Sequence, residues 1–200
     1  MDASPELAVI AELLARHRLE AVLIGNAAAA LQGAPVTTVD FDFLFRKTPA
    51  NLKKLKSMAA ELRAMVLRPY YPVSGLYRIV RDEDGLQIDF MSVIDGISSF
   101  NGLWKRARRI SFGAFPLHVA TLPDIIRSKK AAAWPRDRAV LAVLEQTLAE
   151  TARHEKAETG RSPQESELAL RDQIRRLLAL PPEKRTHFLR KRVSIRMSCL

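Results

Sequence analysis

Two aspartates in phase on one short apolar segment constrain this chain more than any other feature of its sequence. Residues 38–46 read TVDFDFLFR, in which Asp40 and Asp42 alternate with Phe41 and Phe43. Side chains on a strand alternate between faces, so residues two apart point the same way, with Cα atoms roughly 6–7 Å apart. We therefore predict a strand over residues 38–46 that buries its aromatic residues and places both carboxylates on the other face.

Two interpretations of this pair remain open. Two ionised carboxylates side by side repel each other unless a cation lies between them, and Mg²⁺ prefers carboxylate oxygens and bridges to substrate phosphates. A half-exposed strand, however, alternates polar and apolar residues without binding anything. Aspartate is depleted in strands, so a pair of them among bulky apolar residues favours a metal site.

A third carboxylate has the same in-phase setting. Asp89 lies in the segment QIDFM, with Ile88 and Phe90 pointing to the opposite face. Two strands are expected here, over residues 76–80 and 86–91, joined by a turn that ends at Gly85. Other acidic residues of the turn, at positions 82–84, are interpreted as solvated.

Further helices and strands are expected on both sides of this hairpin. Pro, Gly and capping signals place their ends. The expected helices cover residues 4–17, 25–31, 49–62, 100–107, 121–133 and 136–151, and the other strands cover residues 21–24, 108–112 and 115–119. A polar segment over residues 155–161 is expected to be a linker. Two more helices, the last strongly basic, should follow it. We therefore expect a core over residues 1–120, a helical pair over residues 121–154 packed on it, and a basic helical extension over residues 162–200.

Composition narrows the class of protein. The chain has 200 residues, of which 48% are hydrophobic, enough to bury a proper core. No run of about 18 apolar residues predicts a membrane span, the N-terminal residues do not read as a secretory signal, and the single cysteine, Cys199, supports neither a disulfide nor a zinc site. We expect a cytoplasmic protein that does not associate with a membrane.

The net charge is +10, and it is uneven along the chain. Residues 151–200 contain twelve Lys or Arg and six Asp or Glu. A basic surface attracts polyanions at long range, which favours a nucleic acid or a nucleotide as partner. A well-solvated basic surface without such a partner is the alternative.

The ordered set of motifs resembles the nucleotidyltransferase superfamily that includes DNA polymerase β. Its pattern is a strand ending in Gly-Gly or Gly-Ser, a short helix, Asp-x-Asp on the next strand and a third carboxylate on a later one. The matching positions are Gly25-Asn26, Asp40-Phe41-Asp42 and Asp89. The resemblance implies an α+β fold with a mixed, mostly antiparallel sheet flanked by helices.

Within this superfamily the chain is similar to the small bacterial proteins grouped with AbiE-like abortive-infection toxins. The first motif of these proteins is Gly-Gly-x-Ala followed by a stretch that ends in Arg-x-Thr-x-Asp-x-Asp, and Ala28, Thr38 and the two aspartates keep its register. In their second motif, an Arg-Pro-Lys-Asp-like segment carries an Asp eight residues after a helical Lys. The positions that fit this second motif are Lys129, Pro135, Arg136 and Asp137. The resemblance covers about residues 20–150.

The resemblance also implies an activity and its site. A nucleoside monophosphate would pass from a triphosphate such as ATP to an acceptor hydroxyl, with two Mg²⁺ ions held by Asp40, Asp42 and Asp89. Nucleotide binding would fall to Gly25, Asn26, Thr38, Lys129 and Asp137. The acceptor would be tRNA or another RNA, the chain acting as the toxin of a toxin–antitoxin pair with an antitoxin protein as partner. A small hydroxylated acceptor, such as an antibiotic, or a protein side chain is a variant of this hypothesis.

Three positions depart from the family pattern and support a different hypothesis. Asn26 replaces a Gly or Ser, Val36 replaces an Arg, and Trp134 stands where another Arg is expected. Fewer positive side chains near an anionic substrate would weaken its binding. The alternative is therefore a degenerate nucleotidyltransferase fold that acts as a non-catalytic nucleic-acid-binding or regulatory module.

Overall fold

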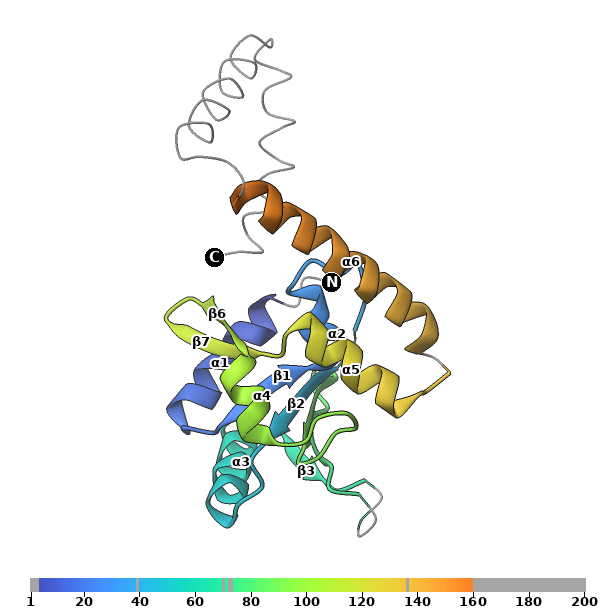
Figure 1. Cartoon of the computed structure of the whole chain (residues 1–200). Helices are drawn as coiled ribbons and strands as arrows, with labels where there is room; N and C mark the ends of the chain where they lie inside the picture. Colours follow the sequence, from blue (N-terminus) through green and yellow to red (C-terminus); the bar gives the residue numbers. More distant parts are fainter. Residues whose placement is uncertain (1–3, 39, 70, 72–73, 136, 160–200) are drawn as a thin grey trace. The chain divides into compact units, whose positions relative to one another are not determined.

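The computed structural model describes residues 4–38, 40–69, 71, 74–135 and 137–159 (Figure 1). Along the chain the elements are α1 (Ser4–Arg16), β1 (Ala21–Ile24), α2 (Gly25–Ala30), β2 (Phe41–Phe45), α3 (Pro49–Glu61), β3 (Met65–Leu67), β4 (Tyr77–Arg81), β5 (Leu86–Met91), α4 (Phe100–Arg106), β6 (Arg108–Phe112), β7 (Phe115–Val119), α5 (Leu122–Ala132) and α6 (Asp137–Thr159).

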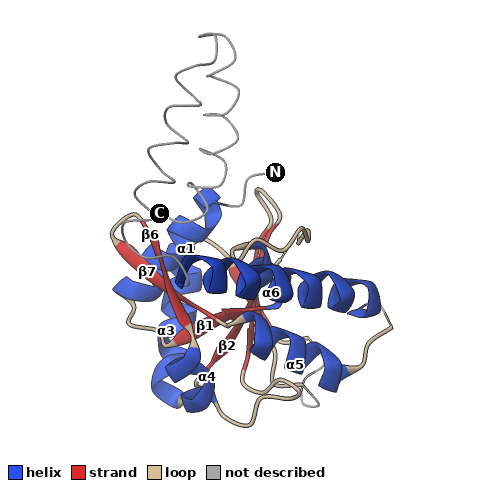
Figure 2. Ribbon diagram, turned by 45° about the horizontal axis from the view of Figure 1, so that its top comes forward, coloured by secondary structure: helices blue, strands red, loops and turns tan. Residues whose placement is uncertain are grey.

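The seven strands form one mixed sheet in the order β3-β4-β5-β2-β1-β7-β6. Neighbouring strands pair antiparallel except at two places, where β1 pairs with β7 and β2 pairs with β5 in parallel. Helices α1 to α5 lie around this sheet, as Figure 2 shows. The predicted α+β class with a mixed, mostly antiparallel sheet is therefore confirmed.

The centre of the sheet carries the core. Every residue of β1 is buried, and the aromatic side chains of β2 pack against the neighbouring strands. Phe43 stacks on Phe90 with ring centroids 5.3 Å apart, and Phe45 meets Phe90 and Tyr77 edge-on at 5.8 Å. Because side chains alternate along a strand, Asp42 lies on the other face of β2 from this aromatic cluster, together with the buried Leu44.

A short alanine-rich helix covers the centre of the sheet. The side chains of Ala27, Ala28 and Ala29 in α2 are buried, and their small size lets the helix approach β1 and β2 closely. Helix α5 packs on α2 in turn. Thr121 caps α5 by accepting a hydrogen bond from the backbone N–H of Asp124.

Two element boundaries differ from the sequence prediction by more than one residue, and one strand was not predicted. Strand β2 begins at Phe41 rather than at Thr38, because the Thr38 hydroxyl bonds locally to the Asp40 carbonyl oxygen, at 2.8 Å, and competes with strand pairing. The segment predicted as a linker is helical through Thr159, since its Glu, Lys and Ala residues are good helix formers. The edge strand β3 is an addition to the predicted elements.

The chain divides into two compact units, Met1–Leu144 and Glu145–Leu200, and α6 crosses the boundary. The described part of the second unit is helical. The predicted basic extension over residues 162–200 and Cys199 lie outside the described residues. Among the helices that are described, none combines the length and apolarity that a membrane span requires.

Candidate metal centre

Three carboxylates converge at one edge of the sheet's central strands. Asp40, Asp42 and Asp89 each offer an oxygen atom, and these atoms lie within 4.8 Å of one another. Asp89 is buried, while the other two are half-buried. Oxygen atoms at this spacing, on side chains that face one another, are a donor set suited to a hard divalent cation.

The sheet topology brings these residues together although they are distant in sequence. Strands β2 and β5 pair in parallel, and their register places Asp42 directly beside Asp89. Asp40 precedes β2 and is held by the Thr38 hydroxyl, which lies 3.0 Å from the Asp40 Oδ1 atom. The Gln87 side chain lies 3.5 Å from the other Asp40 oxygen. Asp40 therefore reaches the centre from a local turn rather than from the strand.

Gly25 makes room for the central carboxylate. It has a φ of +68°, which favours glycine, and a Cβ atom at this position would lie 2.5 Å from the Asp42 Oδ2 atom. Strand β1 pairs Ile24 with Asp42, so the turn into α2 passes directly over the carboxylate. A side chain at position 25 would displace Asp42.

Asn26 ties the start of α2 to the loop before the aspartates. Its Nδ2 group donates a hydrogen bond to the Thr37 carbonyl oxygen at 3.3 Å. Its Oδ1 atom is buried, and no protein group in the described part of the chain bonds to it. The Asn26 side chain, which stands where the family pattern has Gly or Ser, therefore holds the loop that leads to Thr37.

The ionised form of Asp42 is unfavourable in this centre. The pKa of Asp42 is raised from 3.8 to about 7, first by burial and then by the negative charges of Asp40 and Asp89. The positive charges of Lys129 and Arg78 act in the opposite direction and do not offset this rise. A divalent cation would relieve the repulsion among the three carboxylates, so the donor set fits such an ion.

Arg78 is a residue of the centre that the sequence reasoning missed. It lies opposite Asp89 in the β4–β5 pair, and its Nε and Nη2 groups donate to the two Asp89 oxygens at 2.8 and 2.6 Å. The signal was present in the hairpin, because pairing the residues on either side of the 82–85 turn places position 78 opposite position 89.

The predicted pair of Lys129 and Asp137 lies beside the same centre. The Lys129 Nζ atom is 2.8 Å from Asp137 Oδ1, and each side chain is 14% exposed. Lys129 projects from α5 and Asp137 begins α6. This partly buried ion pair holds a cation at the margin of the carboxylate cluster.

Two hollows meet at this cluster. The larger, of about 1250 Å³, is lined by the three carboxylates together with Gly25, Asn26, Thr38, Arg78, Lys129, Trp134 and Asp137. A smaller one of about 290 Å³ shares Asp42, Lys129 and Trp134 with it and is otherwise lined largely by apolar residues of the 91–97 segment and α5. The side chain of Trp134 is 56% exposed at their junction.

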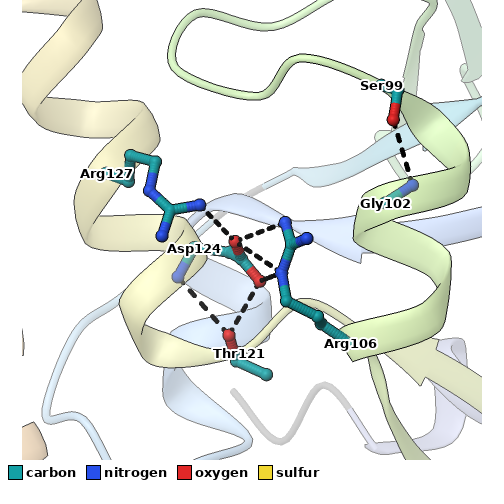
Figure 3. A network of polar contacts seen from close by, with 6 residues as sticks. All are labelled: Ser99, Gly102, Arg106, Thr121, Asp124 and Arg127. Atoms are coloured by element: carbon teal, nitrogen blue, oxygen red, sulfur yellow. Dashed lines mark hydrogen bonds and ion pairs between the residues drawn. The ribbon is translucent and has the colours of Figure 1, made fainter.

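A second buried carboxylate borders the smaller hollow. Asp124 accepts hydrogen bonds from Arg106, Arg127 and the Thr121 hydroxyl, as Figure 3 shows. Burial alone would raise its pKa, but hydrogen bonds from Arg106 and Thr121 and the charges of Arg106 and Arg127 outweigh that effect and lower the pKa. This group is fully paired and ties α4 to α5.

The structure thus brings every predicted site residue to one hollow, although their functional roles stay predictions. His118 stacks on Trp104 with ring centroids 3.7 Å apart. Asp82 and Asp84, interpreted as solvated turn residues, are exposed, and Asp84 pairs with Arg81 on its own hairpin.

No protein-family model and no curated protein sequence matches the chain. Solved structures with a similar arrangement include ANT(2'')-Ia in complex with adenylyl-2''-tobramycin, at 15% identity over 78% of this chain and 95% of that one, with a TM-score of 0.49. A Thermotoga maritima protein provisionally assigned as a nucleotidyltransferase is 20% identical over 77% and 92%, with a TM-score of 0.46. An antigenic nucleotidyltransferase-like protein from Paracoccidioides brasiliensis is 14% identical over 78% and 90%, with a TM-score of 0.42. At these values the site residues themselves must support any function.

Proposed function

We propose that this chain is a divalent-metal-dependent nucleotidyltransferase, which moves a nucleoside monophosphate from a nucleoside triphosphate to an acceptor hydroxyl. The observation that carries this proposal is the meeting of Asp40, Asp42 and Asp89 within 4.8 Å beside a large open hollow. Mg²⁺ bound there would stabilise negative charge on the phosphoryl oxygens.

In the proposed reaction the acceptor oxygen forms a bond to the α-phosphorus, and the bond from that phosphorus to the bridging oxygen of pyrophosphate breaks. Asp40 and Asp42 would hold both metal ions, and Asp89 would hold one of them and take the proton of the acceptor hydroxyl. Lys129, which bonds to Asp137 at 2.8 Å, would pair with the triphosphate. Gly25, Asn26 and Thr38 line the same hollow and would face the phosphates.

Trp134 supplies a surface for the nucleobase in this proposal. It stands where the resemblance expects an Arg, and its half-exposed indole lies at the junction of the two hollows, near the Lys129–Asp137 pair. An aromatic ring stacks on any base, with roughly 1–3 kcal/mol per base. The departure from the family pattern would then exchange a charge contact to phosphate for a stacking contact to the base.

For the acceptor we propose RNA, such as tRNA, and for the biological role a toxin controlled by an antitoxin protein. The net charge of +10 supports a polyanionic partner, whereas an aminoglycoside, being a cation, would be repelled by that charge. Incubation with each α-³²P-labelled triphosphate, Mg²⁺ and total RNA tests the proposal. Labelled RNA that disappears with Asp42→Ala supports it, and transfer that survives Asp42→Ala overturns it.

A non-catalytic nucleic-acid-binding module is the second candidate. The observation that favours it is the pairing of both Asp89 oxygens with Arg78, which leaves the third carboxylate neutralised by a protein group. Calorimetry separates the two candidates. No binding of Mg²⁺-nucleotide at millimolar concentration, together with salt-sensitive RNA binding, would favour the module over the enzyme.

A further inference from the structure

One arginine lies inside the acidic centre and pairs with its most buried carboxylate. The Arg78 guanidinium contacts both oxygens of Asp89, at 2.8 and 2.6 Å, and the Asp89 side chain is only 7% exposed. The antiparallel register of β4 and β5 fixes the two residues opposite each other. This contact is therefore built into the sheet rather than formed by a mobile surface side chain.

The position of Arg78 affects the whole centre. A guanidinium carries donors only and keeps its charge at any ordinary pH. Its positive charge also acts on Asp42, where it lowers the pKa against the effect of burial. A metal ion that uses Asp89 must share that carboxylate with a permanent cation, and two cations within a few ångströms repel each other.

We propose that Arg78 is a built-in counter-ion of the carboxylate centre, which holds Asp89 in place without a metal and weakens the affinity of the centre for a free divalent ion. This inference rests on the metal site of the proposed function. The centre would then take up its ion most readily when an anionic triphosphate arrives with it, because the phosphates offset the charge of Arg78. Arg78 would be a positioning residue and not a catalytic one.

The same strand offers a matched control. Arg81 also pairs with an aspartate through two hydrogen bonds, from Nε and Nη2 to the oxygens of Asp84 at 2.9 and 2.6 Å. Asp84 lies in the exposed turn and not in the carboxylate centre. A change at Arg81 removes a similar ion pair and the same charge from β4 without touching the centre.

The experiment measures the binding of Mn²⁺ alone, by calorimetry and by electron paramagnetic resonance, at pH 8.0 so that the carboxylates are ionised. We expect Arg78→Gln to bind Mn²⁺ at least about tenfold more tightly than the unmodified chain, since one positive charge is gone from the centre. Arg78→Lys keeps the charge and should stay within about threefold of the unmodified chain, as should Arg81→Gln.

Each outcome bears on a different statement. Tighter binding with Arg78→Gln alone supports the inference, and so does an Arg78→Gln chain that folds only when Mn²⁺ is present. Unchanged or weaker binding with Arg78→Gln overturns it, and so does equal tightening with Arg81→Gln. If no variant binds Mn²⁺ at millimolar concentration, the metal site of the proposed function fails, which is a result distinct from unchanged affinity.

Discussion

Two clusters of charged side chains border the hollows of this molecule, and they shift the pKa of their central aspartate in opposite directions. Asp124 receives hydrogen bonds from Arg106, Arg127 and Thr121, and its pKa is lowered (Figure 3). Asp42 has two other carboxylates within 4.8 Å, and its pKa is raised to about 7.

The difference separates a carboxylate that holds the fold from one that is available to a ligand. Around Asp124 two cations surround one anion, so the group is satisfied by the protein itself. Around Asp42 three anions share Arg78 and Lys129, each of which already pairs with a carboxylate. Charge that the protein does not satisfy is typical of functional sites, and the proposed function rests on this difference.

The largest expected effect concerns activity. Asp42→Asn should reduce nucleotidyl transfer to RNA by about 10³-fold or more, because it removes a ligand that both metal ions would share. Asp84→Asn, on the exposed turn of the neighbouring hairpin, is the matched control and should transfer normally. Initial rates with labelled triphosphate and Mg²⁺ measure both. Comparable rates for the two variants would remove the distinction between Asp42 and an ordinary acidic residue.

The next effect is on the stability of the metal-free protein. Most substitutions lower the free energy of unfolding, but Asp42→Asn should raise it. The pKa of Asp42 is about 7 in the folded protein against an ordinary 3.8, so the folded state binds the proton more tightly than the unfolded state. The favourable contribution of Asp42 is present at low pH and is lost as the pH rises from about 4 to about 7. Three pH units correspond to about 4 kcal/mol at most.

Asp42→Asn should therefore raise the free energy of unfolding relative to the unmodified chain at pH 8, and the gain should shrink towards pH 5. Urea denaturation in the presence of EDTA at both pH values measures it. A gain that is the same at pH 5 and pH 8 would show that the Asp42 carboxylate does not titrate in this range.

For Asp124, the other aspartate of the comparison, a substitution should have the opposite effect on the free energy of unfolding. Asp124→Ala should lower the free energy of unfolding by about 2–3 kcal/mol. It removes the carboxylate in the first turn of α5 that bonds to the capping Thr121 hydroxyl, and it leaves two arginines without their buried anion. This figure is below that for a fully buried pair because the Arg106 and Arg127 side chains are about half exposed. Thermal or urea unfolding at pH 8 checks it, with Asp84→Ala as the variant expected to lose less.

The smallest expected effect tests whether Trp134 contacts the nucleobase in the hollow. Trp134→Ala should weaken the binding of Mg²⁺-nucleoside triphosphate about tenfold through loss of stacking, while the binding of Mg²⁺-tripolyphosphate, which has no base, should not change. Trp134→Phe should restore most of the nucleotide affinity. Calorimetry with both ligands measures this. An equal loss for both would assign Trp134 to the phosphates instead.

Much of this arrangement could be predicted from local pattern. The alternation of Asp40 and Asp42 with phenylalanines, and of Asp89 with Ile88 and Phe90, indicated which faces meet the core. Capping signals placed α5. These features depend on residues close in sequence, for which strand and helix periodicity is a sufficient guide. The Lys129–Asp137 pair was expected from the family resemblance and not from periodicity.

Other features were missed because polar side chains determine them, and hydrophobic periodicity does not report such contacts. The start of β2 was placed too early because the Thr38 hydroxyl bonds the Asp40 carbonyl instead of leaving it to the sheet. The polar end of α6 was read as a linker since periodicity was absent there, although its residues favour helix. Arg78 was missed because its role appears only when the β4–β5 register is applied across the turn.

The parallel pairing of β2 with β5 also has a consequence for how the molecule assembles. Parallel neighbours cannot be joined by a tight turn, and here β3, β4 and an intervening helix separate the two strands along the chain. The three carboxylates therefore come together only after this long loop has closed, and closure of long loops is slow. An ion that used all three carboxylates would bind only the finished structure, and it would then stabilise the folded state by mass action.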